Sequence, residues 1–329
     1  MKHRFLRRFT AIVMAFIMVM GLIIPTEVYA KKKAPKLDCK INDSNMLKLV
    51  KAYNSDAYHI LKKQKDNGDS FASWMNYGDK LSDMVDTTVH EEFHAYIIKQ
   101  GKFSWGKQEW AFYTGKGKTI YVPITKVFKT SDATKSIAKK YRTFRYDTYA
   151  STGSNLSSNL NGVYGLMNEF SAYYWGCNAN NSMYEYLKYY SKGASAWNRY
   201  INSYLNNRNA YAEFYYWTLT YLEYARTKKP KVYKEIMANK NYVICFDTMQ
   251  KNFEKLLKSC EKNLDKVCKK YNGKSFKDSF NEESGMVYLD GRWSGAGAND
   301  YRTLMKQINS KSLKKVKKAL SDNAKKYKK

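Results

Sequence analysis

The sequence predicts a mainly helical protein of the α+β type, with one small β-hairpin between two of its helices. Apolar side chains recur about every four residues from Leu81 to Ile97, as in an amphipathic helix. Aromatic residues follow helical spacing in the stretch Trp197–Arg226. Aromatic and β-branched runs flank a glycine turn at Gly115–Lys118, which is typical of a hairpin. The length of 329 residues allows one large domain.

Residues 1–30 have the three parts of a secretory signal peptide. Basic residues come first, a nearly unbroken apolar run extends from Phe9 to Pro25, and Val28–Ala30 forms a small-residue cleavage site. The alternative is a signal anchor that stays in the membrane. The segments that we expect to follow are a basic leader at 31–40, a single folded domain at 41–310 and a Lys-rich tail at 311–329.

A helical pattern extends from Asn45 to about Gln64 and contains His59. A lone histidine on an amphipathic helix is more often a surface or core residue than a ligand, and we interpret His59 in that way. A turn at Asn67–Ser70 separates this segment from the next helix.

The helix predicted at 81–97 contains the motif His90-Glu91-Glu92-Phe93-His94. Residues four apart lie one turn from each other on one face of a helix, so both imidazoles can bind one metal ion. Glu91 lies one step round the helix and can reach a water molecule on that ion. Two histidines and a carboxylate base on one turn are the arrangement of zinc hydrolases. The alternative is a helix with two solvated histidines.

The runs Trp110–Tyr113 and Thr119–Val122 are the two strands of the predicted hairpin. An exposed strand edge beside a metal site can hold a substrate backbone by strand addition. A purely structural hairpin explains the same pattern at least as well.

A polar loop at Ser151–Gly165 precedes an apolar helix predicted at Leu166–Trp175, in which Glu169 is the only acidic residue. A carboxylate in such a stretch is costly unless it is paired or bound to a metal. A catalytic zinc takes three protein ligands and keeps one position open for water. Because His59 is the only spare histidine after the signal peptide, an acidic third ligand is the economical choice, and Glu169 is the candidate. The alternative is an ion pair between Glu169 and a lysine or arginine.

These residues resemble the motif of the gluzincin group of zinc metallopeptidases. The match consists of His90-Glu91 and His94, followed by Asn168-Glu169 on a later helix. The resemblance implies a zincin-like catalytic domain in which His90, His94 and Glu169 bind Zn²⁺ and Glu91 is the general base. It covers two short helices of the chain.

The chain departs from the family pattern in three ways, one of which is that no clear strand-rich region precedes the motif helix. The gap between His94 and Glu169 is long, and Tyr173 stands where the thermolysin-like pattern has Asp. The stretch Asn161–Tyr174 also resembles uncharacterised secreted proteins of Gram-positive bacteria. We therefore expect a divergent member of the group, secreted or associated with the bacterial cell surface.

The chemistry that the motif implies is hydrolysis of a polypeptide by a zinc-bound water. Glu91 would take the proton of that water and pass it to the leaving amine. A further donor must stabilise the oxyanion. Tyr164 and Tyr173 are near Glu169 in the sequence and are the candidates for this role.

The rest of the chain is predicted to be largely helical. Helices are expected over Trp197–Arg226 and Tyr233–Tyr271, because Pro230 breaks the run between them. The aromatic stripe of the first helix is either core packing or the lining of a cleft for peptide or sugar. Leu289–Asp300 is predicted to be a glycine-rich loop without a phosphate-binding pattern. The Lys-rich tail is a solvated helix or an anchor on polyanions.

The chain carries a formal net charge of +29, which favours polyanionic partners such as an anionic cell-wall polymer or a membrane surface. We favour the simpler interpretation of solubility with loose retention at an anionic surface. No zinc finger or RNP-type motif is present, so we expect no specific nucleic-acid partner. We expect a monomer. The five cysteines allow one bridge that the sequence does not assign, and at least one thiol is free or pairs between chains.

The sequence thus predicts a secreted zinc metallopeptidase. The rival interpretation is a cell-surface polyanion-binding protein with a structural or vestigial zinc site. A working site has an open position at the metal and a cleft that reaches it, whereas a structural site is closed by a fourth protein ligand.

Overall fold

The computed structural model describes residues 40–76, 78–295 and 298–328. The predicted signal peptide, all but the last residue of the leader, and Cys39 lie outside the described residues. Helices account for 68% and strands for 9% of the structure, so the mainly helical class is confirmed. The finer expectation of a zincin-like arrangement remains a prediction. None of the helices in the described ranges is both long enough and apolar enough to cross a bilayer.

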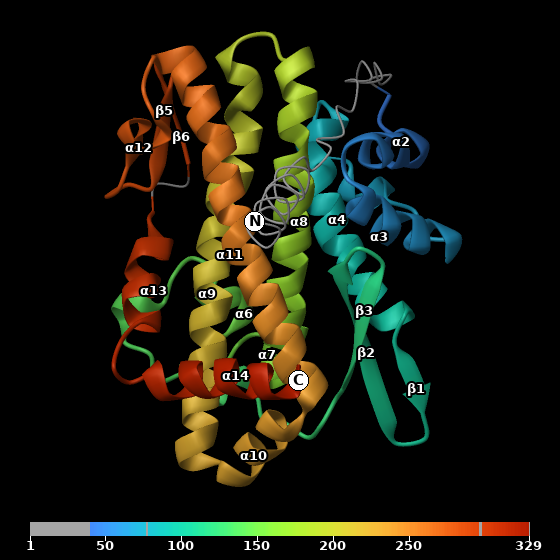
Figure 1. Cartoon of the computed structure of the whole chain (residues 1–329), viewed down its shortest axis with the longest axis vertical. Helices are drawn as coiled ribbons and strands as arrows, with labels where there is room; N and C mark the ends of the chain where they lie inside the picture. Colours follow the sequence, from blue (N-terminus) through green and yellow to red (C-terminus); the bar gives the residue numbers. More distant parts are fainter. Residues whose placement is uncertain (1–39, 77, 296–297, 329) are drawn as a thin grey trace, which may run out of the picture. The chain divides into compact units, whose positions relative to one another are not determined.

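Three long helices form the centre of the fold. They are α8 (Gly162–Tyr190), α9 (Asn198–Lys228) and α11 (Lys240–Asn272), and they lie side by side in Figure 1. A fourth helix, α4 (Leu81–Lys99), packs along α8. Pro230 has no backbone N–H for α9, so it breaks the run as predicted and begins α10 (Pro230–Ala238). The single helix predicted over Tyr233–Tyr271 is wrong: α10 and α11 are separated at Asn239, whose side-chain oxygen accepts a hydrogen bond from the N–H of Tyr242.

The aromatic side chains of α9 fill the core between these helices. Tyr204, Tyr211 and Trp217 are fully buried. The ring of Tyr211 contacts Phe170 of α8 and Phe253 of α11. These rings therefore pack the core, and Tyr211 together with Tyr215 also lines a cavity of about 310 Å³.

The helix predicted at 45–64 is two helices, α2 (Asp43–Tyr53) and α3 (Ser55–Asp66). Asn54 separates them because its backbone is extended and its side-chain oxygen accepts a hydrogen bond from the N–H of Ala57. Asparagine favours this capping position over a helix interior. The prediction of one continuous helix was wrong for that reason.

The predicted hairpin is confirmed, and a short third strand extends it. The antiparallel order is β1 (Lys102–Ser104), β2 (Lys107–Gly115) and β3 (Lys118–Pro123). The hairpin lies between α4 and α8 in the chain and contacts α4 and α11. The carbonyl of Tyr121 accepts a hydrogen bond from Asn241 of α11, so β3 already has a partner beyond its strand neighbour.

A second antiparallel sheet consists of β4 (Phe280–Asn281), β5 (Met286–Leu289) and β6 (Arg292–Ser294). It corrects the prediction of a glycine-rich loop over 289–300. The turn Asp290-Gly291 has positive φ angles of 48° and 79°, which match the twist of a two-residue hairpin. An Asp-Gly pair between aromatic and aliphatic residues was the signal that could have shown this hairpin.

The C-terminal segment forms α13 (Asp300–Ile308) and α14 (Lys314–Tyr327). Helix α13 packs on α9, and α14 packs on α11. Val316, Leu320 and Ala324 of α14 are buried, so this Lys-rich segment is an amphipathic helix with an apolar stripe against the core.

The four cysteines that the structure describes are buried free thiols. The sulfur atoms of Cys177 on α8 and Cys260 on α11 lie 3.9 Å apart without a bond. No bridge is therefore formed among the described cysteines.

Short helical segments make up most of the connections between the larger elements. Those between β3 and α8 matter for the site, because this part of the chain folds back over α8 and α9. The short segments are η1 (Ala72–Trp74), α5 (Thr130–Thr134), η2 (Lys139–Tyr141), α6 (Tyr146–Tyr149), α7 (Ser157–Leu160), η3 (Ala194–Trp197), α10 (Pro230–Ala238) and α12 (Phe276–Ser279).

Candidate metal centre

Helix α4 presents the two histidines of the motif toward α8. Val85, Val89 and Phe93 on the apolar stripe are fully buried, which fixes the rotation of the helix. His90 and His94 then lie one turn apart, with ring centroids separated by 4.8 Å. The sequence pattern predicted both the helix and this pairing.

Helix α8 brings Glu169 to the same place. Glu169 is 7% exposed, and its Oε2 atom accepts no hydrogen bond from any described residue. The two helices come close at Gly176, where a Cβ atom would lie 2.8 Å from the carbonyl oxygen of Asp86. Glycine permits this close approach because it has no side chain to clash with α4.

The three donor atoms face one point. The Nε2 atoms of His90 and His94 are 3.1 Å apart, and Oε2 of Glu169 lies 3.9 Å and 3.4 Å from them, respectively. Donors about 2.0–2.1 Å from one tetrahedral ion lie roughly 3.3 Å from each other. The three separations are close to that value, so this group could hold a metal ion.

Asn168 fixes the orientation of His94. Its Oδ1 lies 2.6 Å from Nδ1 of His94, and an amide oxygen can only accept there. The proton of a neutral His94 is therefore on Nδ1, which leaves the lone pair of Nε2 directed toward His90 and Glu169. Carbonyl partners of this kind are common behind metal-binding histidines.

Burial and charge shift the pKa values of the cluster in different directions. Burial, aided by His94 and Arg145, lowers the pKa of His90 well below its usual range. Burial also lowers the pKa of His94, but the carboxylate of Glu169 outweighs it and raises that pKa to about 9. Burial raises the pKa of Glu91.

A cavity of about 150 Å³ opens beside the cluster. Its wall includes His90, Glu91, Tyr149, Tyr173 and Asn206. Glu91 therefore faces the same space as one of the candidate ligands. The cavity admits one side chain or a short piece of backbone rather than a whole ligand of drug size.

An ion pair that the sequence did not predict lies behind Tyr173 and Tyr149 in the wall of this cavity. Nη1 of Arg145 lies 2.6 Å from Oε2 of Glu213, and both side chains are almost completely buried. The Nε–H of Arg145 donates to the hydroxyl oxygen of Tyr173 at 3.0 Å. Tyr173 in turn lies 3.3 Å from the hydroxyl of Tyr149. Burial raises the pKa values of both tyrosines, so both remain protonated donors.

The sequence predicted Tyr173 near the site but missed these partners. Glu213 lies within the aromatic stripe of α9, so it gives the same signal as Glu169, an acidic residue in an apolar helix. Arg145 and Tyr149 lie in the irregular connection before α8, where no periodicity marks them.

Tyr164 is not brought to the cluster. Its hydroxyl lies 2.7 Å from Oγ1 of Thr125 and accepts from Nδ2 of Asn239 at 3.2 Å. Five residues correspond to about 140° around a helix, so Tyr164 and Glu169 occupy different faces of α8. Proximity in the sequence was the wrong criterion for this candidate.

His59 is a structural residue. Its ring stacks on Tyr113 with centroids 4.5 Å apart, and its Nε2 lies 3.4 Å from the hydroxyl of Tyr96. Burial lowers the pKa of His59. It takes no part in the metal cluster, in agreement with the interpretation of a lone histidine.

No family model, curated protein or solved structure matches this chain. The resemblance to gluzincins therefore depends on the motif residues, and the relationship remains a prediction.

Proposed function

We propose that this chain is a zinc-dependent hydrolase that cleaves peptide bonds. The observation that carries the proposal is the triangle of donor atoms from His90, His94 and Glu169, with the buried Oε2 of Glu169 left without a hydrogen-bond donor. A buried carboxylate oxygen without a partner is costly, and a cation at the centre of the triangle would remove that cost. Two imidazoles and one carboxylate are the donor set of the His₂Glu catalytic zinc sites, so zinc is the metal that we propose.

When bound, the metal would supply Lewis-acid chemistry that makes water a nucleophile near neutral pH. Glu91 would accept the proton of the attacking water at its carboxylate and return it to the leaving amine. Its place in the cavity wall beside His90 supports this role.

Tyr173 would donate a hydrogen bond to the oxyanion. Because Arg145 donates to its oxygen, the hydroxyl proton of Tyr173 remains available for a ligand or for Tyr149. The buried guanidinium of Arg145 adds positive charge behind this donor, with its centre 5.0 Å from the ring of Tyr173. Fixed donors of this type stabilise charge that develops during reaction.

The peptide substrate is proposed from the resemblance, and export is proposed from residues 1–30. The rival proposal, a cell-surface polyanion-binding protein with a structural zinc site, requires a fourth protein ligand. Among the described residues, the cluster contains three donor groups, and a cavity rather than a fourth donor adjoins them. This observation favours the hydrolase.

Replacement of Glu91 by glutamine tests the proposal. We expect Glu91→Gln to keep the metal and to lose at least about 100-fold in cleavage of a peptide library, measured by mass spectrometry. Glu92→Gln is the matched control. Glu92 is the next residue on the same helix and is also buried, but it lies outside the cavity wall, so metal and activity should both persist.

Retained cleavage in Glu91→Gln would contradict the mechanism. A metal-loaded protein that cleaves no peptide in the library would favour the polyanion-binding alternative.

A further inference from the structure

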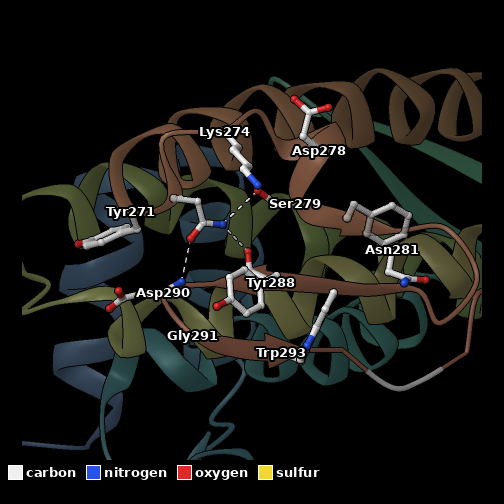
Figure 2. A pocket seen from close by; sticks show the side chains of 11 residues that line it. Tyr271, Lys274, Asp278, Ser279, Asn281, Tyr288, Asp290, Gly291 and Trp293 are labelled. Carbon is white, nitrogen blue, oxygen red and sulfur yellow. Dashed lines mark hydrogen bonds between the residues drawn. The ribbon is translucent and has the colours of Figure 1, made fainter.

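A second cavity, wider than the one beside the metal centre, lies elsewhere on the molecule. It has a volume of about 600 Å³ and lies where α11 ends against α12 and the β4–β5–β6 sheet (Figure 2). None of the metal-centre residues lines it. Its size is within the range of ligand-binding cavities, which is 300–1,000 Å³.

The sheet presents two aromatic side chains to this cavity. Tyr288 of β5 pairs directly with Trp293 of β6, so both side chains lie on the same face of the sheet. Their ring centroids are 5.3 Å apart at 63°. Val287 and Leu289 point to the other face and are buried in the core. The hydrophobic core is therefore complete without the aromatic pair.

Both rings are exposed at a cost. Trp293 is 53% and Tyr288 39% exposed, and the sheet face on which they lie also carries Asn281. Large aromatic residues that stay in contact with water beside a cavity are typical of binding sites.

Hydrogen bonds hold the cavity wall in shape. The amide of Asn272, at the end of α11, donates to the hydroxyl of Ser279 at 3.1 Å and to the carbonyl of Tyr288 at 2.6 Å. Its oxygen accepts from the N–H of Asp290 at 2.8 Å. Figure 2 shows these three bonds, which join the end of α11 to Ser279 of α12 and to the β5–β6 hairpin. The aromatic pair is thus fixed relative to α11 and α12, so binding requires little reorganisation.

The cavity also offers polar groups for a ligand. The carboxylate of Asp290 and the ammonium of Lys274 form no ion pair with any described residue. Asp278 also lines the cavity, but its carboxylate accepts a hydrogen bond from Ser275 and points away from Tyr288 and Trp293 in Figure 2. One carboxylate beside one ammonium gives this wall no excess of positive charge for an anionic ligand, although the chain as a whole is strongly basic.

We propose that this cavity binds a neutral oligosaccharide. The apolar C–H face of a sugar ring can lie on Trp293 and Tyr288, while its hydroxyl groups donate to the carboxylate of Asp290 and accept from Lys274. A purely apolar ligand would leave these charged groups desolvated without partners. A ligand with one apolar face and hydroxyl groups around its edge satisfies both parts of the wall. The proposal does not depend on activity at the metal centre.

Titration with sugars tests this proposal. The probes are tetrasaccharides of β-1,4-linked N-acetylglucosamine and of β-1,4-linked glucose, added to the purified chain from Lys31 onward and followed by calorimetry. We expect saturable binding of at least one probe and a loss of at least about tenfold in affinity in Trp293→Ala. Trp105→Ala is the matched control, because Trp105 is fully exposed but lies outside the cavity, and binding should not change.

A second variant guards against misfolding. Asn can adopt the positive φ angle of Asp290, so Asp290→Asn keeps the turn and removes only the charge. We expect this variant to bind a few-fold more weakly with an unchanged circular dichroism spectrum. Absence of binding for both tetrasaccharides at about 10 mM, or equal binding by Trp293→Ala, would overturn the proposal. So would binding of choline that depends on Trp293 in the absence of sugar binding, because it would identify a cation site.

Discussion

Glu169 and Glu213 give the same sequence signal but have opposite surroundings. Each is a carboxylate within a long aromatic helix, and each is buried. Glu213 receives hydrogen bonds from Arg145 and Thr143, which satisfy both of its oxygens. Glu169 faces two histidines, and its Oε2 receives no hydrogen bond from the described residues.

The comparison teaches how to separate a structural carboxylate from a candidate ligand. Burial alone does not decide, since both are buried. Complete pairing with a cation indicates a structural role, whereas an oxygen without a donor beside two imidazoles indicates a metal position. The alternative that the sequence left open for Glu169, an ion pair with a lysine or arginine, describes Glu213 instead.

The largest effect is expected for the loss of Glu213, the structural carboxylate of the two. Glu213→Ala leaves the guanidinium of Arg145 buried without its partner, which should lower the free energy of unfolding by about 3–5 kcal/mol. Urea denaturation measures the change. The matched control is Glu254→Ala, which removes an exposed pair with Lys258 and should change stability by about 0–1 kcal/mol. Equal effects of the two variants would contradict the account of Glu213.

The next largest effect concerns the metal centre that contains Glu169. Asn168→Ala removes the acceptor that fixes the Nδ1 proton of His94, so zinc affinity should fall by about 10–100-fold. Competition with a fluorescent chelator measures it. Asn180→Ala is the control, because Asn180 is buried on the same helix but bonds to the carbonyl of Tyr200. If the two variants bind zinc equally, Asn168 does not position the ligand.

Zinc affinity should also depend on pH. In the metal-free protein Glu169 raises the pKa of His94 to about 9, whereas burial lowers that of His90. At pH 7 His94 is therefore protonated and His90 is neutral. Only neutral imidazole binds zinc, so binding should release about one proton and strengthen about tenfold per unit from pH 7 toward 9. Calorimetry in two buffers with different ionisation heats counts the protons, and no release would contradict this assignment.

The smallest effect tests the close approach of the two helices. In Gly176→Ala the new Cβ would lie 2.8 Å from the carbonyl oxygen of Asp86 and 3.3 Å from Cβ of His90. Overpacking of this kind costs about 1–3 kcal/mol, and the gain in helix propensity of about 1 kcal/mol offsets part of it. Thermal unfolding should show a net loss of about 1 kcal/mol. Gly153→Ala, whose new Cβ would be 3.9 Å from its nearest neighbour, should show none.

The sequence was sufficient for several elements in which local periodicity decides the structure, although it missed the helix breaks at Asn54 and Asn239. The stripe from Leu81 to Ile97, the hairpin around Gly115–Lys118 and the break at Pro230 are present as predicted. The histidine pair and Glu169 followed from helical spacing and from the cost of burying a carboxylate.

The sequence was insufficient where contacts between distant segments decide. Arg145 pairs with Glu213, which is 68 positions away in the sequence, and no local pattern predicts that pair. Tyr164 was placed by nearness to Glu169, although the helical rotation directs it to Asn239. The second sheet was missed because its strands are short and the glycines after them suggested a loop.

Metal content tests the central claim most directly. The purified chain from Lys31 onward, its Glu169→Ala variant and its Glu213→Gln variant would be reconstituted with zinc and measured by mass spectrometry. The account predicts about one zinc ion per chain, lost in Glu169→Ala and retained in Glu213→Gln. No bound zinc in the unaltered chain, or full zinc content in Glu169→Ala, would contradict it.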